Sequence, residues 1–526
     1  MTATAALLKA CQDELVQRQQ RAVLLCDADY HIDAHELKPL TLDDQASDQF
    51  AMHRYRDYLG VSNTLVVLNF AQTIHADALA ALAGTVAAGG LLIINLPRQQ
   101  AAFTERLLRL ADDFELIFLI NHQQALNQAY QQIAASPQRH IAALSFPTAA
   151  QQRIIWAMQE QLNTTHVLLA DRGRGKSTTL GIALAHYCGT DRLLLTAPKR
   201  SQAEAVLQQA KGRAEFVAWE RLLELPSAGI RLVIDEAAGL PIHILQRLCQ
   251  HYRVWAIATT VEGYEGCGRG FVIRFLGWLG QHHLYQQHQL HQSLRWRNPD
   301  NCEDWLNQLL CLRTSTETSV WEHGYHWLHA SSLTDTQLNQ VMQLLLHAHY
   351  QSSPNDLRLL LDDRRQKLLL WCQDDNLIGL IWIAEEGPVA KHLWPDILAG
   401  VRRPAGDLLP QALAYNWQQQ APMQWRWWRI VRIAVSATHR RQGHGSRLLV
   451  QIKHRAEQQQ IDAIGSSFGD AAEVLAFWQA NNYQLVHRGY KRQMASGYVN
   501  AMVAVGITEA ARQLIALKYP GVPLER

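Results

Sequence analysis

Short apolar runs separated by helical patterns recur along three successive stretches of the chain. In the first stretch, strands are predicted at 22–28, 64–70 and 91–97, and an alanine-rich helical pattern occupies 75–90. Strand, helix and strand in this rhythm indicate a parallel sheet. We therefore predict an N-terminal α/β domain over 1–137. It lacks a glycine-rich phosphate-binding pattern, which favours a packing or scaffold role.

The second and third stretches are also predicted to be α/β. Strands at 166–170, 191–197, 230–237 and 253–260 are nearly continuous apolar runs, as expected of a sheet buried on both faces. The third stretch has strand patterns at 367–373, 377–386 and 429–437 around helical segments. The predicted domains are 138–335 and 336–505, followed by a short C-terminal tail at 506–526.

Composition narrows the class of protein. A chain of 526 residues is too long for one hydrophobic core, and 48% hydrophobic with 18% charged residues indicates globular domains. Eight scattered cysteines without a CxxC pair argue against a zinc site or a disulfide framework. We find no signal peptide and no apolar run near the roughly 18 residues of a membrane helix. We expect a cytoplasmic protein without a membrane partner.

A glycine loop at 170–181 (ADRGRGKSTTLG) follows a predicted strand and begins a helix. It matches the phosphate-binding pattern GxxxxGK[ST], with Ala170 at the first glycine position. Backbone N–H groups around Gly173 to Gly175 can face phosphate oxygens, Lys176 can reach the terminal phosphates, and Ser177 can ligate Mg²⁺. The loop therefore predicts an ATP site.

Two acids strengthen this prediction. Asp235 and Glu236 end an apolar strand, where the first would contact the metal and the second would polarise water. Only one domain of this kind carries such motifs, whereas a translocating helicase needs two. We therefore expect a conformational switch driven by ATP.

A second glycine loop, Arg440 to Gly445, lies between a predicted strand and a clear helix. It reads RxxGxG and has no lysine. Several N–H groups and the helix dipole would face one diphosphate there. Without a lysine or a metal-binding serine, the loop suits a diphosphate that is held and not hydrolysed, as in coenzyme A.

This third stretch resembles the GNAT acetyltransferases. The resemblance is carried by the strand at 433–435, the loop at 440–446 and the later helix in AAEVLAFWQANNY (471–483). Many GNAT enzymes have a tyrosine after the phenylalanine of that helix to protonate the leaving thiolate, but here Trp478 follows Phe477. Tyr483, Tyr490 and Tyr498 are the alternatives, and the sequence does not choose between them.

Nearly the whole chain resembles the tRNA(Met) cytidine acetyltransferase family, in which a helicase-type ATPase is joined to a GNAT domain. The resemblance is carried by TAAQQ, RGRGKS, VIDEAAGLP, TTVEGYEGCGRGF, SLRWR, RIAV, RRQGHGS and SSFGDAAEVLAFW. It implies an α/β, multidomain fold with a Rossmann-like N-terminal domain, a RecA-like P-loop ATPase domain and a GNAT domain. The implied activity is ATP-dependent formation of N4-acetylcytidine at the wobble position of elongator tRNA(Met), with no DNA partner.

The resemblance also implies which residues bind each ligand. The expected ATP-binding residues are Gln151, Gly173, Arg174, Gly175, Lys176, Ser177, Thr178, Thr179, Leu180, Gly181, Ile182 and Arg295, with Gln151 reading the adenine. The expected Mg²⁺ ligands are Ser177 and Asp235. The expected acetyl-CoA-binding residues are Ile433, Ala434, Val435, Arg440, Arg441, Gln442, Gly443, His444, Gly445, Ser446 and Glu473.

Contacts with RNA are predicted from local basic surface, because the net charge of +2 says nothing by itself. In QWRWWRIVR, Trp425, Trp427 and Trp428 are either a stacking surface or part of a core. Candidate phosphate contacts are Arg426, Arg429, Lys491 and Arg492. Two other functions stay open: a protein or small-molecule acetyltransferase with a regulatory ATPase, and an RNA-remodelling ATPase.

Overall fold

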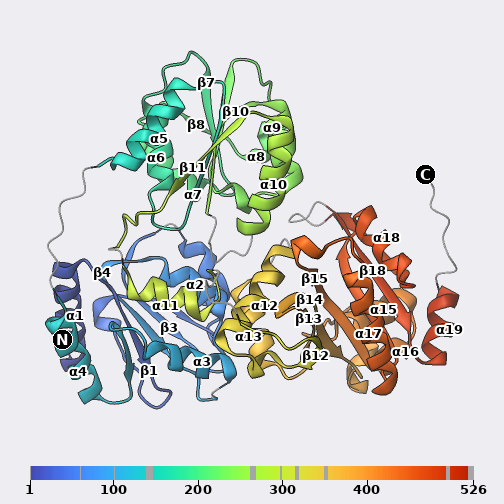
Figure 1. Cartoon of the computed structure of the whole chain (residues 1–526). Helices are drawn as coiled ribbons and strands as arrows, with labels where there is room; N and C mark the ends of the chain where they lie inside the picture. Colours follow the sequence, from blue (N-terminus) through green and yellow to red (C-terminus); the bar gives the residue numbers. More distant parts are fainter. Residues whose placement is uncertain are drawn as a thin grey trace. The chain divides into compact units, whose positions relative to one another are not determined.

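The chain folds as two compact units, one of 1–313 with 350–358 and one of 314–349 with 359–526 (Figure 1). The structure is a computed structural model. It describes residues 2–59, 61–99, 101–137, 146–260, 268–296, 299–313, 319–348, 353–492 and 498–518. Three separate β-sheets, two in the first unit and one in the second, carry the α/β architecture predicted from the sequence.

The N-terminal sheet is entirely parallel, in the order β2-β3-β4-β1-β5. Its strands are β1 (Ala22–Cys26), β2 (Leu40–Asp43), β3 (Asn63–Asn69), β4 (Val86–Asn95) and β5 (Ile117–Ile120). Its helices are α1 (Ala3–Arg18), α2 (Ala76–Ala83), α3 (Ala102–Ala111) and α4 (Gln123–Ala135). β1 is buried along its whole length, which explains why its sequence is continuously apolar.

The second sheet is parallel and has the order β11-β6-β10-β9-β7-β8. Its strands are β6 (Thr165–Ala170), β7 (Arg192–Thr196), β8 (Glu215–Phe216), β9 (Ile230–Ile234), β10 (Arg253–Thr260) and β11 (Tyr285–Leu290). Its helices are α5 (Ala149–Glu160), α6 (Lys176–Ala185), α7 (Arg200–Gln209), α8 (Trp219–Leu222), α9 (Ile242–His251) and α10 (Gly268–His282). β10 separates β6, the strand before the lysine-bearing loop, from β9, the strand before the acids.

The segment after this sheet contacts the N-terminal sheet of the same unit. Helix α11 (Asn301–Leu309) accepts a hydrogen bond from the Arg106 side chain of α3 at the Leu309 carbonyl, over 3.1 Å. Arg21, at the start of β1, forms a fully buried ion pair of 2.8 Å with Asp300. A buried pair of this kind costs several kcal/mol to break from one side, so it fixes this segment firmly.

The third sheet has seven strands in the order β12-β13-β14-β15-β16-β18-β17, antiparallel except between β15 and β16. They are β12 (Gly324–Leu328), β13 (Gln366–Gln373), β14 (Asn376–Glu386), β15 (Trp427–Val435), β16 (Ala463–Gly469), β17 (Gln484–Arg492) and β18 (Val499–Gly506). The helices are α12 (Asp335–Ala348), α13 (Pro354–Asp362), α14 (Trp394–Leu398), α15 (Leu408–Trp417), α16 (Ala421–Gln424), α17 (His444–Gln458), α18 (Ala472–Ala480) and α19 (Glu509–Lys518). β12 precedes the predicted boundary at 336, and α19 lies within the predicted tail.

Trp427 and Trp428 of β15, and Trp425 two residues before the strand, are core residues. Trp427 and Trp428 have no exposed surface, and Trp425 is 8% exposed. Trp428 packs with the residues under α17, whereas Trp425 and Trp427 pack under α15 on the opposite face. The interpretation of these three rings as an RNA-stacking surface is therefore wrong. The mixture of Trp and Arg in this segment belongs to a strand whose tryptophans pack into a core on each face, and not to an exposed groove.

We expect Trp428→Ala to lower the free energy of unfolding of the second unit by about 3–5 kcal/mol, because it opens a cavity beside the stacked ring of Trp327. Differential scanning calorimetry measures the effect as a lowered transition temperature. Trp156→Ala is the control, since that ring is 71% exposed and should leave the transition unchanged. Equal shifts in the two variants would contradict this description of the core.

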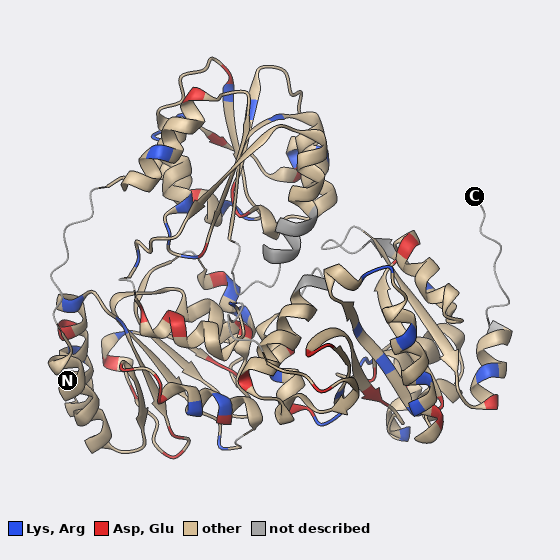
Figure 2. Ribbon diagram, in the orientation of Figure 1, with Lys and Arg blue, Asp and Glu red and all other residues tan. Residues whose placement is uncertain are grey.

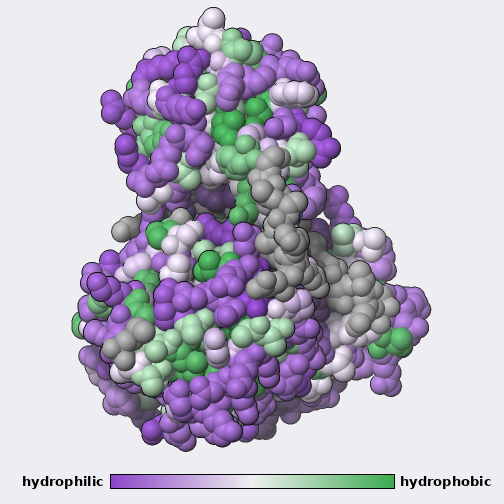
Figure 3. All heavy atoms as spheres, turned by 90° about the vertical axis from the view of Figure 1, so that its left-hand side faces the viewer, coloured by the Kyte–Doolittle hydropathy of each residue, from purple (hydrophilic) through white to green (hydrophobic). Residues whose placement is uncertain are grey.

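The surface of the described residues mixes apolar, acidic and basic side chains. No helix in the described ranges is long and apolar enough to cross a membrane. On the face shown in Figure 3, hydrophobic residues form patches separated by hydrophilic ones. Acidic and basic residues are interspersed over the helices and loops (Figure 2).

Candidate functional sites

The lysine-bearing loop joins β6 to α6 through two glycines in left-handed conformations. Gly173 has a φ of +78° and Gly175, which caps α6, has a φ of +80°. A Cβ atom at Gly175 would lie 2.4 Å from the Leu294 side chain and 2.7 Å from that of Gln151. Glycine is therefore required both by conformation and by space. The loop presents the N-terminus of α6, as a phosphate site needs.

Lys176 lies at the carboxyl edge of the sheet, between the strands that carry its partners. Its Nζ is 2.8 Å from Glu236 Oε1 and 3.0 Å from Thr260 Oγ1 at the end of β10. Burial acts to lower the pKa of Lys176, but the negative charges of Glu236 and Asp235 outweigh it, and the net shift is upward. Lys176 is thus a buried cation paired with the Glu236 carboxylate. A phosphate that binds Lys176 would have to compete with this carboxylate.

Ser177 and Asp235 meet at the same edge. Ser177 Oγ donates a 2.8 Å hydrogen bond to Asp235 Oδ2. Burial, reinforced by the charge of Glu236, raises the pKa of Asp235 to about 6. Burial also acts to raise the pKa of Glu236, but Lys176 outweighs it and the net shift is downward. A hydroxyl and a carboxylate side by side fit Mg²⁺, which takes few protein ligands and retains waters.

Glu236→Gln should keep ATP binding and slow hydrolysis by about 10²–10⁴-fold, because the amide cannot accept a proton from water. It also removes the ion pair that occupies Lys176, so ATP affinity should rise or stay unchanged. Equilibrium binding of a fluorescent ATP analogue and single-turnover hydrolysis measure the two effects separately. Hydrolysis at the wild-type rate would exclude Glu236 as the base.

Gln151 holds the loop in place. Its Nε2 donates to Thr179 Oγ1 over 3.1 Å and to the Gly175 carbonyl over 3.3 Å, while its Oε1 accepts from the Thr148 backbone N–H over 2.9 Å. The side chain has no exposed surface. These bonds give Gln151 a positioning role, and its expected contact with adenine stays a prediction.

Arg295 belongs to a segment that lies against the same loop. The backbone N–H of Leu294 donates to the Gly173 carbonyl over 2.8 Å, and Arg295 Nη1 donates to the Gly84 carbonyl over 2.8 Å. Burial, together with Arg172 and Arg21, lowers the pKa of Arg295 to about 10. The guanidinium remains charged at neutral pH beside the loop.

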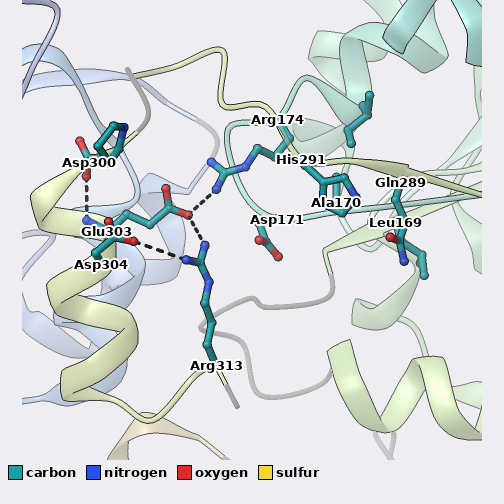
Figure 4. A pocket seen from close by; sticks show the side chains of 12 residues that line it. Leu169, Ala170, Asp171, Arg174, Gln289, His291, Asp300, Glu303, Asp304 and Arg313 are labelled. Atoms are coloured by element: carbon teal, nitrogen blue, oxygen red, sulfur yellow. Dashed lines mark hydrogen bonds and ion pairs between the residues drawn. The ribbon is translucent and has the colours of Figure 1, made fainter. Parts of the chain in front are cut away.

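A pocket of about 480 Å³ lies beside the loop and contains an ion-pair cluster that sequence reasoning missed (Figure 4). Arg174 and Arg313 both point toward Glu303 of α11, at 2.5 and 3.5 Å. Trp296 Nε1 also donates to Glu303, over 2.9 Å. Arg174 is expected to contact the nucleotide, but in this structure its side chain is paired with Glu303 of α11. No local pattern marks Glu303, because its partner is 129 residues away.

Strands β15 and β16 separate at the predicted acetyl-donor site. Their parallel ladder ends at Ile430–Ser466, so residues 433–435 lie beyond it. On the other edge, Arg432 pairs with Trp382 and Ile430 with Ile383, which leaves Val431 as a bulge. Backbone groups of 433–435 that face β16 are consequently outside that ladder, where they can bond to a ligand carbonyl.

The lysine-free loop has the shape of an anion site at a long helix. Arg441 and Gly443 have φ values of +61° and +79°, and α17 begins at His444. Gly445 faces the ring of Phe477, which a Cβ atom would contact at 3.4 Å. His444 is buried and its Nδ1 accepts a 3.1 Å hydrogen bond from Trp371. Burial, followed by Arg447 and His439, lowers the pKa of His444, which keeps the ring neutral as an acceptor.

The three candidate acids differ in accessibility. Tyr483 is 1% exposed against Trp478, and burial raises its pKa well above the usual range. Tyr490 and Tyr498 are 95% and 49% exposed. Tyr483 is therefore the least suited to donate a proton, and the other two remain open. Glu473, expected at the acetyl-CoA site, is exposed in the first turn of α18.

Not every expected residue can be placed. Residues 261–267 of TTVEGYEGCGRGF, Arg297 of SLRWR and the side chains of Lys491 and Arg492 lie outside the described parts of the chain. Arg426 is exposed and donates to the Gln459 carbonyl. Arg429 forms an ion pair with Glu386.

Comparison with known proteins matches three protein families along the chain. Residues 4–133 match "tRNA(Met) cytidine acetyltransferase TmcA, N-terminal". Residues 167–313 match "RNA cytidine acetyltransferase NAT10/TcmA, helicase domain", and residues 340–459 match "GNAT acetyltransferase 2". The first two matches cover the first and second sheets, and the third match covers strands β13, β14 and β15 of the third sheet.

Two of the similar curated proteins are tRNA(Met) cytidine acetyltransferases named TmcA. That of Idiomarina loihiensis is 39% identical over 472 residues, covering 88% of this chain and 76% of the relative. That of Photorhabdus asymbiotica is 30% identical over 549 residues, covering 95% and 78%. A solved GNAT acetyltransferase of Elizabethkingia anophelis with acetyl-CoA bound is 13% identical, covers 35% of this chain and 97% of that one, and has a TM-score of 0.23, too low to support an inference.

Proposed function

The chain belongs to the tRNA(Met) cytidine acetyltransferase family, and from this we propose that it transfers the acetyl group of acetyl-CoA to the N4 amine of the wobble cytidine of elongator tRNA(Met). The observation that carries the proposal is the presence in one chain of two different phosphate loops. The loop before α6 has a lysine beside two acids, and the loop before α17 has none and lies next to separated strands.

The second unit, which contains the GNAT match and is called the GNAT unit below, would position the substrates for acetyl transfer. Acetyl-CoA, when bound, supplies an activated thioester. The loop at 440–445 and the N-terminus of α17 would hold its diphosphate, and a backbone N–H beyond the end of the β15–β16 ladder would bond to the thioester carbonyl. The N4 amine then attacks the acetyl carbon, the carbon–sulfur bond breaks, and one N4 proton is lost while the thiolate gains one. Because that amine is conjugated with the ring and weakly nucleophilic, alignment provides much of the rate.

The first unit would bind ATP and Mg²⁺ and change conformation to present the anticodon loop. Lys176 would leave Glu236 for the phosphates, and Ser177 and Asp235 would exchange their mutual hydrogen bond for the metal. Glu236, once released, would accept a proton from water. We further propose the domain ranges 1–137, 138–335 and 336–505, and a cytoplasmic location.

The two alternative functions, an acetyltransferase for other acceptors and an RNA-remodelling ATPase, are not favoured by the relatives.

Nucleoside analysis of total tRNA tests this proposal. We expect N4-acetylcytidine to disappear from a strain that lacks the gene and to return when the intact chain is supplied. A deletion strain with an unchanged amount of N4-acetylcytidine, in an organism without a second enzyme of this family, would contradict the proposed function.

A further inference from the structure

The second unit contains a pocket of about 770 Å³ that none of the expected acetyl-CoA-binding residues lines. Its volume lies within the roughly 300–1,000 Å³ of small-molecule sites. The floor includes Glu386 of β14, Arg429 of β15 and Asn500 of β18, and the wall includes Ala412 and Tyr415 of α15. It lies entirely within the GNAT unit.

The pocket is on the face of the sheet opposite α17. Along β15, Trp428 and Ile430 pack with Leu448 and Ile452 of α17, whereas Trp427 packs under α15. Side chains alternate between faces along a strand, so Arg429 points away from α17 and into the pocket. The loop before α17, which would hold the acetyl donor, is therefore on the α17 side of the sheet. The pocket is on the opposite face.

The pocket also lies where β15 and β16 separate. The ladder between them ends at Ile430–Ser466, one residue beyond Arg429. Asn500, on the far side of β16, pairs with Gly469 at the end of that strand and accepts a 3.0 Å hydrogen bond from Ser467 Oγ. The lining residues thus bracket the opening between the strands, through which an amine on one face can reach a thioester held from the other.

The charges of the pocket suit an anion. Arg429 forms a 2.5 Å ion pair with Glu386, which is 4% exposed and also accepts a 2.8 Å hydrogen bond from the Leu409 backbone. The acid is therefore neutralised by its own partners. Arg402 and Arg403 are exposed and form no ion pair with any described residue. After Arg429 and Glu386 pair, the charge left in the pocket is that of the two arginines and is positive, which suits a bound phosphate.

Two aromatic side chains line the same pocket. Tyr415 is 39% exposed, and the Arg403 guanidinium is 5.9 Å from the centre of its ring. Tyr490, at the β17 side of the pocket, is 95% exposed. An accessible ring next to an arginine, as at Tyr415 and Arg403, is the combination with which proteins hold unpaired bases and their phosphates.

We propose that this pocket receives the acceptor nucleotide, a single pyrimidine nucleotide turned out of an RNA loop, with its phosphate against Arg402 and Arg403 and its base beside Tyr415. The inference rests on the proposed function and adds the acceptor site to it. The base enters from the α15 face, and its exocyclic amine reaches the opening between β15 and β16.

The test uses the full chain in steady-state acetylation of tRNA with acetyl-CoA and ATP. Arg402→Ala with Arg403→Ala should lower kcat/KM for tRNA about tenfold or more, through the loss of charged phosphate contacts. Ala412→Phe should do the same by filling the pocket without changing charge. Acetyl-CoA affinity by calorimetry and basal ATPase activity should stay at wild-type values in both. Cytidine 5′-monophosphate should compete with tRNA in the wild type and lose that effect in both variants.

Arg364→Ala with Arg512→Ala is the matched control, because it removes two exposed arginines of the same unit away from the pocket. An equal loss in this control, or an unchanged kcat/KM in both pocket variants, overturns the acceptor site while the proposed function stands. A wild-type chain that acetylates no tRNA contradicts the proposed function and the pocket together.

Discussion

Lys176→Ala should lower the rate of ATP hydrolysis by about 10²–10³-fold, since it removes a fixed positive charge from the place where phosphate charge develops. It should also depress tRNA acetylation, because we assign the conformational switch to this site. Acetyl-CoA binding should stay near the wild-type value, since the lysine-free loop lies in the other unit. Phosphate-release kinetics, a tRNA acetylation assay and calorimetry measure the three quantities.

Two controls accompany this variant. Lys9→Ala removes an exposed lysine that pairs with Asp13 on the same helix, and it should change none of the three quantities. Thermal unfolding checks that Lys176→Ala remains folded, because Glu236 loses the cation that compensates its buried charge. A folded Lys176→Ala chain that hydrolyses ATP normally, or that loses acetyl-CoA binding, would refute the assignment of separate sites.

Gly443→Val should reduce acetyl-CoA affinity by about 10–100-fold. Gly443 has a φ of +79°, and a β-branched residue forced into that region costs about 1–3 kcal/mol, which the loop relieves by leaving its diphosphate-binding shape. The space around Gly443 is open, so backbone conformation and not crowding within the protein causes the loss. Calorimetry with acetyl-CoA measures it, and ATPase activity should survive.

Gly324→Val provides the matched control for this strain. Gly324 also has a positive φ, +133°, and open space around it, but it begins β12 and does not belong to the loop. It should lower stability without changing acetyl-CoA affinity. Unchanged affinity in a folded Gly443→Val chain would refute the role of this loop in binding coenzyme A.

Most of the fold could be predicted from local sequence. Buried parallel strands such as β6 and β9 are nearly continuous apolar runs, and the spacing of Gly173, Gly175 and Lys176 marks a loop whose conformation glycine alone adopts easily. The same holds for Gly443 at the start of α17. These features are encoded by neighbouring residues, so a single sequence reveals them.

Contacts between distant residues could not be predicted in this way. Arg174 pairs with Glu303 across 129 positions, and the pocket at Arg429 is assembled from several strands and a helix. The burial of Trp427 and Trp428 was equally ambiguous, because large rings suit both a core and a nucleic-acid surface. Tertiary packing decided each of these cases.

The most direct test of the central claim is a reconstituted reaction of the purified chain with unmodified elongator tRNA(Met), acetyl-CoA, ATP and Mg²⁺, followed by mass spectrometry of the nuclease fragments. We predict one added acetyl group, at N4 of the wobble cytidine, with formation that depends on ATP and is strongly reduced in Gly443→Val at low acetyl-CoA concentration. Absence of acetyl transfer to this tRNA, or acetylation at another position, would contradict the account.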